Sequence, residues 1–150
     1  MKITALEEYG LRCMLFLAKH HESKPLTLPE FSKNEGVSIP YVGKLLMILK
    51  KADLVKAIRG RNGGYSLTRD PSDILLKEIF DALGEPVYSA EHCDKFSGDK
   101  AICVHKNKCT VRGVWKTFDG FIGTILTKIT LADLINTKGN INKILDIQKV

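Results

Sequence analysis

Three cysteines, Cys93, Cys103 and Cys109, lie within one polar stretch of the sequence. An odd number of thiols in a single flexible stretch is a poor framework for disulfide bonds, which use cysteines in pairs. Deprotonated thiolates bind soft metal ions and iron–sulfur centres, and a loop can wrap around such a centre. The residue types and their spacing therefore predict a thiolate-bound metal or iron–sulfur site between residues 93 and 109.

Other chemistries remain open for the same stretch. Three thiolates and one imidazole, from His92 or His105, would also suit tetrahedral zinc, and thiols that only change oxidation state are a further alternative. A nucleophilic cysteine needs a positioned base and an orienting group. The sequence shows neither a nucleophile motif nor a phosphate-cradling loop, so we expect no enzyme. The fourth cysteine, Cys13, lies in an apolar helical pattern and is interpreted as a small buried hydrophobe.

Composition indicates the setting in which these thiols work. The chain has 150 residues, a net charge of +6 and 44% hydrophobic residues, which fits one domain with at most a small appendage. The positive charge favours an anionic partner, nucleic acid before membrane. No stretch approaches the ~20 apolar residues of a membrane span, and the N-terminus does not resemble a signal peptide. We therefore expect a cytoplasmic protein with reduced thiols and no membrane partner.

The N-terminal region carries the signals of a helix-turn-helix. Residues 1–22 are predicted to form a helix with one apolar face, made by Leu6, Tyr9, Cys13, Phe16 and Leu17. Thr27 and Glu30 predict the capped start of a second helix, and Gly36 predicts its left-handed end. Ser38 then caps a third helix over residues 39–51. A short helix, a glycine turn and a following helix are typical of a DNA-binding motif.

The first turn of the third helix is predicted to face the major groove. Ser38, Pro40 and Tyr41 lie outside the apolar stripe of this helix, where such motifs meet base edges, and we assign Lys44 to a phosphate. Two structural helices that merely pack together would show a similar pattern.

A β-hairpin follows directly and strengthens the DNA-binding interpretation. Residues 54–58 and 65–68 read as strands, and the turn between them holds three glycines and two arginines. Such a hairpin after a recognition helix is a wing, whose arginines can meet phosphates or a narrow minor groove. We expect DNA contacts from the wing residues Arg59, Arg61, Asn62, Gly63 and Tyr65.

Beyond the wing, the sequence predicts a helix over residues 74–83, the cysteine stretch, and then a longer helix. Its apolar residues recur in a heptad pattern: Val111, Trp115, Phe118, Ile122, Ile125 and Ile129. The rest of the chain is too small to bury this whole stripe, so we expect a homodimer helix; part of the stripe would equally suit packing against the first helix. Thr130 and Asp133 predict the cap of a short further helix.

Four stretches of the sequence resemble the Rrf2 family of bacterial transcription regulators. They are Met1-Lys-Ile-Thr with Tyr9 and Leu11-Arg12; Gly36-Val-Ser-Ile-Pro-Tyr41; Arg59-Gly-Arg-Asn-Gly-Gly-Tyr65 with Leu67 and Asp70-Pro71; and Ile129-Thr-Leu-Ala-Asp-Leu134. The Arg-Gly-x-x-Gly-Gly-Tyr stretch is the most specific of them. The resemblance implies a winged helix with a long dimerisation helix. It also implies, for members with three cysteines, a [2Fe-2S] or [4Fe-4S] cluster that senses redox state, nitric oxide, iron or iron–sulfur status.

The resemblance also bears on the ligands of that cluster. Cys93, Cys103 and Cys109 match the three family cysteines, although the gap from Cys93 to Cys103 is longer than in the better-known branches. The branch that controls cluster assembly has a histidine ligand three residues after the last cysteine, where this chain has Arg112. An acidic residue on the partner's first helix completes the site in the nitric-oxide-sensing branch, and Glu8 matches that position. His92 and His105 are local alternatives. At position 43, where some members have a glutamate that affects base preference, this chain has Gly43.

These observations predict a mainly α fold with a small β-hairpin wing. We divide the chain into a winged helix-turn-helix domain (1–83), a cysteine-bearing loop (84–109), a dimerisation helix with a short following helix (110–136) and a frayed tail (137–150). The predicted function is a homodimeric repressor of transcription that binds a pseudo-palindromic DNA operator and whose affinity depends on an iron–sulfur cluster. A zinc-stabilised or thiol-redox winged-helix protein without a cluster is the alternative.

Overall fold

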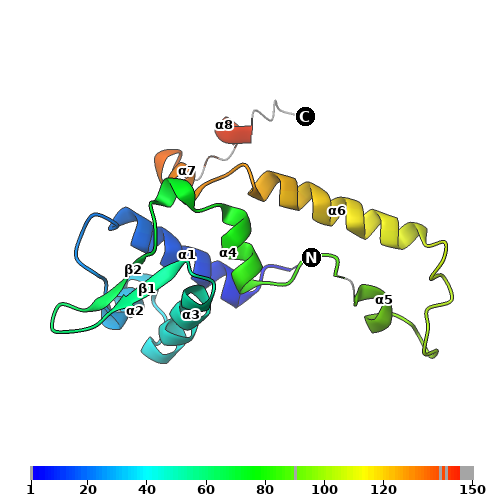
Figure 1. Ribbon diagram of the computed structural model, residues 1–150, viewed down its shortest axis with the longest axis horizontal. Helices are drawn as coiled ribbons and strands as arrows, with labels where there is room; N and C mark the ends of the chain where they lie inside the picture. Colours follow the sequence, from blue (N-terminus) through cyan, green and yellow to red (C-terminus); the bar gives the residue numbers. More distant parts are fainter. Residues whose placement is uncertain (1, 90, 139, 141, 146–150) are drawn as a thin grey trace.

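The computed structural model describes residues 2–89, 91–138, 140 and 142–145, and it is mainly helical with one two-stranded hairpin (Figure 1). The elements are α1 (Ala5–Lys19), α2 (Leu28–Glu35), α3 (Ile39–Lys51), β1 (Val55–Ile58), β2 (Gly64–Leu67), the 3-10 turn η1 (Pro71–Asp73), α4 (Leu76–Leu83), α5 (His92–Lys95), α6 (Thr110–Leu126), α7 (Leu131–Asn136) and α8 (Asn142–Leu145). The predicted fold class is confirmed. No described helix has the length and apolar character needed to cross a membrane.

Local capping sets the bounds of the first three helices. The Thr4 hydroxyl accepts the backbone N–H of Glu7 at 3.2 Å, and the Glu7 carboxylate accepts the Thr4 N–H at 2.7 Å. This reciprocal pair starts α1 at Ala5, so the prediction that the helix covers residues 1–22 is wrong at both ends. Gly36, with φ 67° and ψ 30°, ends α2 as predicted, and Ser38 caps α3.

The hairpin is short and tightly turned. Its strands pair antiparallel from Val55 opposite Leu67 to Ile58 opposite Gly64. In the turn, a Cβ atom at Gly63 would lie 2.3 Å from the carbonyl oxygen of Ile58, so a side chain at this position cannot be accommodated. The backbone of Tyr65 also pairs with that of Leu26, with N···O distances of 2.8 and 2.9 Å, which fastens the hairpin to the segment before α2.

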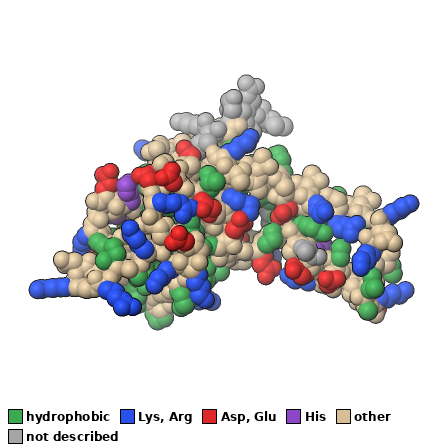
Figure 2. Space-filling view, viewed as in Figure 1, with side chains coloured by type: hydrophobic (Ala, Val, Ile, Leu, Met, Phe, Trp, Pro, Cys, Tyr) green, Lys and Arg blue, Asp and Glu red, His purple; other side chains and the backbone are tan. Residues whose placement is uncertain are grey.

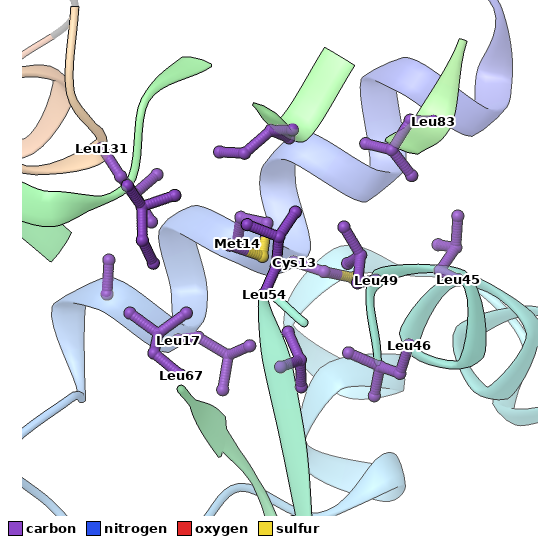
Figure 3. Close-up of a cluster of buried hydrophobic side chains, with 14 of the residues drawn as sticks. Cys13, Met14, Leu17, Leu45, Leu46, Leu49, Leu54, Leu67, Leu83 and Leu131 are labelled. Atoms are coloured by element: carbon purple, nitrogen blue, oxygen red, sulfur yellow. The ribbon is translucent and has the colours of Figure 1, made fainter. Parts of the chain in front are cut away.

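The core lies where α1, α3, α4 and the base of the hairpin meet (Figure 3). Its side chains are apolar and nearly free of solvent; the labelled ones are Cys13, Met14, Leu17, Leu45, Leu46, Leu49, Leu54, Leu67, Leu83 and Leu131. Burying one such side chain contributes about 1.5–3 kcal/mol relative to leaving it exposed. The core therefore fixes α3 and the hairpin relative to one another.

After α6 the chain returns to this core. The Leu76 N–H donates to the carbonyl of Ile129 at 2.9 Å, and the Leu131 N–H donates to that of Ile74 at 2.8 Å. Ile129 is 1% exposed and Leu131 is fully buried. The prediction that Ile129 belongs to the stripe of the long helix is wrong, because α6 ends at Leu126 and the chain then pairs with the residues that precede and open α4.

Helix α6 extends away from the body of the molecule, with α5 near its far end (Figure 1). None of its residues is buried. Large apolar side chains are exposed along it: Val111, Val114, Trp115, Phe118 and Phe121. The predicted tail contains α8, and residues 139, 141 and 146–150 of that tail lie outside the described residues.

Candidate functional site

The first turn of α3 is presented to solvent. Ser38, Pro40 and Lys44 are exposed, whereas Tyr41 is half-buried. The ring of Tyr41 meets the ring of Tyr9 edge-to-face, with centroids 6.0 Å apart. Helix α1 therefore fixes the direction of Tyr41, and only part of this side chain is free to meet a base.

Two α1 residues that the sequence did not mark as functional, Tyr9 and Arg12, lie on the side of α1 that meets this turn. The Arg12 guanidinium sits over the Tyr9 ring at 5.2 Å and pairs with the Glu8 carboxylate at 2.5 Å. The hydrogen bonds that Arg12 donates to Glu8, and then the negative charge of Glu8, raise the pKa of Arg12. Glu8, the candidate ligand, is thus engaged within its own helix, in an i,i+4 pair that the sequence could have revealed.

The wing brings further cations to the same part of the molecule. Arg59, Arg61 and Asn62 are exposed in the hairpin turn, and the Gly63 N–H closes the turn on the carbonyl of Gly60 at 3.0 Å. Figure 2 shows Lys and Arg side chains along the edge of the body where Figure 1 draws the hairpin and α3. Tyr65 lies in β2, half-buried against the core, where it holds the wing in place.

The charges of this surface are available to an anionic partner. Lys44, Arg59 and Arg61 form no ion pair with any residue that the structure describes. Arg69, in contrast, binds the Glu78 carboxylate and the carbonyls of Asp53 and Asp73, so its charge is used inside the fold. Exposed, unpaired cations on a recognition helix and wing can neutralise phosphates.

The cysteines occupy three different local settings. Cys93 lies in α5, Cys103 lies in the loop after it, and Cys109 precedes the first residue of α6. All three thiols are free and partly exposed, whereas Cys13 is buried in the core. The Cys109 sulfur accepts the backbone N–H of Arg112 at 3.3 Å.

The structure does not draw these ligands together. Among the described residues, no group of three or more His, Cys, Asp or Glu side chains is placed to hold a metal ion. Glu8 lies on α1, His92 in α5 packs at a tilt against the Tyr88 ring, and His105 is exposed in the loop. The donor chemistry of three free thiols on one segment nevertheless fits a soft metal or an iron–sulfur centre.

Comparisons with known proteins bear on both the surface formed by α3 and the wing and the segment that carries the three cysteines. A family model described as "Rrf2: Iron-dependent Transcriptional regulator" matches residues 3–137. The HTH-type transcriptional regulator IscR of Yersinia pseudotuberculosis is 33% identical over 138 residues, covering 92% of this chain and 81% of that protein.

Solved structures give the same picture. The structure of T. potens IscR superposes with a TM-score of 0.73 at 30% identity, covering 92% of this chain and 88% of that one. The structure of CymR, the global cysteine regulator of B. subtilis, gives a TM-score of 0.71 at 30% identity, with 91% and 98% covered.

Proposed function

The chain belongs to the Rrf2 family of transcriptional regulators, and from this premise we propose that it binds a pseudo-palindromic operator as a homodimeric repressor under the control of an iron–sulfur cluster. It is a regulator and not an enzyme. The observation that carries the proposal is the position of the free thiols Cys93, Cys103 and Cys109, on the segment that leads into the exposed apolar face of α6.

The DNA-binding part of the proposal rests on α3 and the wing. Ser38, Pro40 and the exposed part of Tyr41 read base edges, while Lys44 meets a phosphate. Arg59 and Arg61, with Asn62 and the backbone at Gly63, meet the phosphates or the minor groove beside the recognition helix. Tyr65 supports the wing from β2.

The dimer part rests on α6. An apolar stripe that is exposed in one chain is typical of an interface. Contact of apolar side chains with water is unfavourable, and a partner that covers the stripe removes this cost. Two copies that pair through α6 about a two-fold axis present two recognition helices, and the operator must then repeat in opposite orientations.

Cys93, Cys103 and Cys109 would hold the cluster, with Glu8 of the partner subunit as the fourth ligand and His92 or His105 as local substitutes. When bound, the cluster supplies a centre that reacts with oxidants or nitric oxide and depends on iron supply; its type, [2Fe-2S] or [4Fe-4S], follows from the spectra below. Glu8 must leave Arg12 before it can act as a ligand. Reduced thiols are needed throughout, which fits a cytoplasmic protein.

The start of α6 and the dimer interface would couple the cluster site to DNA binding. Convergence of the three thiolates displaces Cys109, whose sulfur caps α6. Movement at the start of α6 alters the dimer interface, and the interface sets the separation of the two recognition helices.

Anaerobic purification tests the proposal. We expect a coloured protein that contains iron and acid-labile sulfide and binds its operator differently from the apo form. Cys93→Ala, Cys103→Ala and Cys109→Ala should each lose the colour, and Cys13→Ala is the matched control that should keep it. A colourless protein with stoichiometric zinc would establish the zinc-stabilised alternative, and a protein that holds no metal after reconstitution would leave thiol oxidation as the signal.

A further inference from the structure

The segment that carries Cys93 is built around a row of three rings that pack at a tilt. His92 lies between Tyr88 and Phe96, with ring centroids 5.3 and 4.9 Å away. His92 and Phe96 lie four residues apart, so the single turn of α5 places their rings on the same side, and Tyr88 adds the third ring from the bend before α5. Backbone bonds from His92 to Ser89 and from Phe96 to His92 keep this turn closed.

This turn is fastened to the middle of α6. The backbone N–H of Tyr88 donates to the Asp119 carboxylate at 3.4 Å, and the Lys116 ammonium lies 5.7 Å from the centre of the Tyr88 ring. At its other end, Lys95 pairs with Glu85 at 3.3 Å. The turn that carries Cys93 is therefore attached to α6 through Tyr88.

The stretch around Cys103 has no comparable attachment. Between residues 97 and 108, the backbone hydrogen bonds among described residues are the local ones from Lys106 to Cys103 and from Lys108 to His105. Ile102 and Val104 on either side of Cys103 are more than 60% exposed. Cys109, in contrast, is tied to α6 by the bond from Arg112.

We propose that Tyr88, Lys116 and Asp119 are positioning residues that hold Cys93 at a fixed place along α6, leaving Cys103 as the thiol that closes the ligand set. This inference rests on the proposed function, since it assigns fixed and mobile members to the same three thiolates. Lys116 and Asp119 lie seven and ten residues beyond Cys109, about 10–15 Å along the helix. The segment from Cys93 thus has to run on to the start of α6, and Cys103 lies within that segment.

Alkylation of the reduced apo protein, followed by mass spectrometry, tests the inference without any cluster. In the wild type, Cys93 should react more slowly than Cys103. Asp119→Ala, Lys116→Met or Tyr88→Leu should raise the rate at Cys93 about threefold to tenfold, because each removes one hydrogen bond or cation–π contact. The rates at Cys103 and Cys109 should not change.

Conservative variants separate positioning from a general loss of structure. Asp119→Asn keeps the acceptor for the Tyr88 N–H, and Tyr88→Phe keeps the ring, so both should restore the slow rate at Cys93. Lys108→Met, which removes a cation from the unattached stretch, is the matched control. In reconstituted protein, Asp119→Ala should also shift the circular dichroism of the cluster and speed its loss, and Asp119→Asn should reverse both effects.

Equal alkylation rates at Cys93 and Cys103 in the wild type, or a Cys93 rate that none of these variants changes, would overturn the inference even in a protein that carries a cluster. A wild type that never binds iron overturns the proposed function instead. The alkylation rates still decide the position of Cys93 in that case.

Discussion

The DNA-binding part of this molecule and the α5–α6 arm differ in how they are held together. All the buried core residues lie between Cys13 and Leu83, except Ile129 and Leu131, and no described residue from Gly84 to Lys128 is buried. The first part is stabilised by its own core. The arm exposes apolar side chains and thiols, and so it depends on what binds to it. A regulator benefits from this division, because a signal can reshape the arm without unfolding the DNA-binding part.

The helix caps show the same difference. Helices α1, α2 and α7 begin with a threonine whose backbone N–H is accepted by the carboxylate three residues later. Helix α6 begins with Cys109, whose sulfur is a weak acceptor. A cap made by sulfur changes when the sulfur binds a metal or is oxidised. The first turn of α6 is therefore sensitive to thiol chemistry in a way that the first turns of α1, α2 and α7 are not.

The largest expected difference between the two parts concerns folding. Leu45 is fully buried and Phe121 is 66% exposed. Leu45→Ala should lower the free energy of unfolding by about 2–5 kcal/mol. Phe121→Ala should leave it nearly unchanged when urea denaturation is followed at a dilution where the protein is monomeric. Similar losses for the two variants would mean that the arm has a core of its own.

Cys13, in the DNA-binding part, should be alkylated far more slowly than the three cysteines of the arm. Burial raises the pKa of Cys13 to about 12 from an ordinary value of 9.0. At pH 8 this lowers the thiolate fraction about a thousandfold. Iodoacetamide should therefore modify Cys93, Cys103 and Cys109 in the folded apo protein, and Cys13 only after urea is added. Rapid modification of Cys13 without denaturant would contradict the burial of this thiol.

The apolar stripe of α6 should govern assembly and not folding. Phe118→Asp places a charge in the proposed interface and should raise the dimer dissociation constant about 30-fold or more. Thr124→Asp adds the same charge on another side of the helix and should have little effect. Analytical ultracentrifugation measures both. A dimer that tolerates Phe118→Asp would require a different interface.

Cations should contribute to DNA binding only when they lie on the DNA-binding part. Arg59→Ala or Arg61→Ala should reduce the slope of log affinity against log salt by roughly one unit and weaken binding about tenfold. Lys100→Ala removes an exposed cation from the arm and should change neither quantity. Fluorescence anisotropy on operator and random DNA gives both. An equal loss of affinity in Lys100→Ala would show that the net charge of the protein, and not the position of the cation, determines binding.

The smallest expected effect is the response to acid. The backbone and side-chain hydrogen bonds from Thr27 lower the pKa of Glu30 to about 2 from 4.5. The folded state thus favours the carboxylate, so its contribution to stability is complete above pH 4.5 and is lost as the pH falls towards 2. Glu30→Gln should flatten this part of the curve of unfolding free energy against pH. Glu85→Gln, in an exposed pair of the arm, should leave the curve as it is.

Local signals in the sequence were sufficient to predict the helix-turn-helix. Thr27 and Gly36 determine where α2 begins and ends, and Ser38 determines where α3 begins. They act through contacts with residues only a few positions away, and the structure confirms these bounds. The hairpin was predictable for a similar reason, since its turn requires glycines that the sequence displays.

Features that depend on contacts between distant residues were not predictable. The heptad pattern continues to Ile129, and periodicity alone cannot show that the chain leaves the helix and pairs with Leu76. The Tyr9–Tyr41 contact joins two helices whose relative placement the core decides. Helix α5 is too short to show an apolar period. The cysteine residues identify the sulfur donor atoms, but their spacing in the sequence does not show how these atoms are arranged in space.

The backbone bonds that join Ile74 and Leu76 to residues 131 and 129 also constrain the order of folding. They close a loop that contains the whole cysteine segment and α6, and closing a long loop costs entropy before its contacts form. During synthesis, the helix-turn-helix and hairpin emerge first, but the last core positions stay empty until Ile129 and Leu131 follow. The DNA-binding part thus reaches its full stability only after the entire α5–α6 arm has been made.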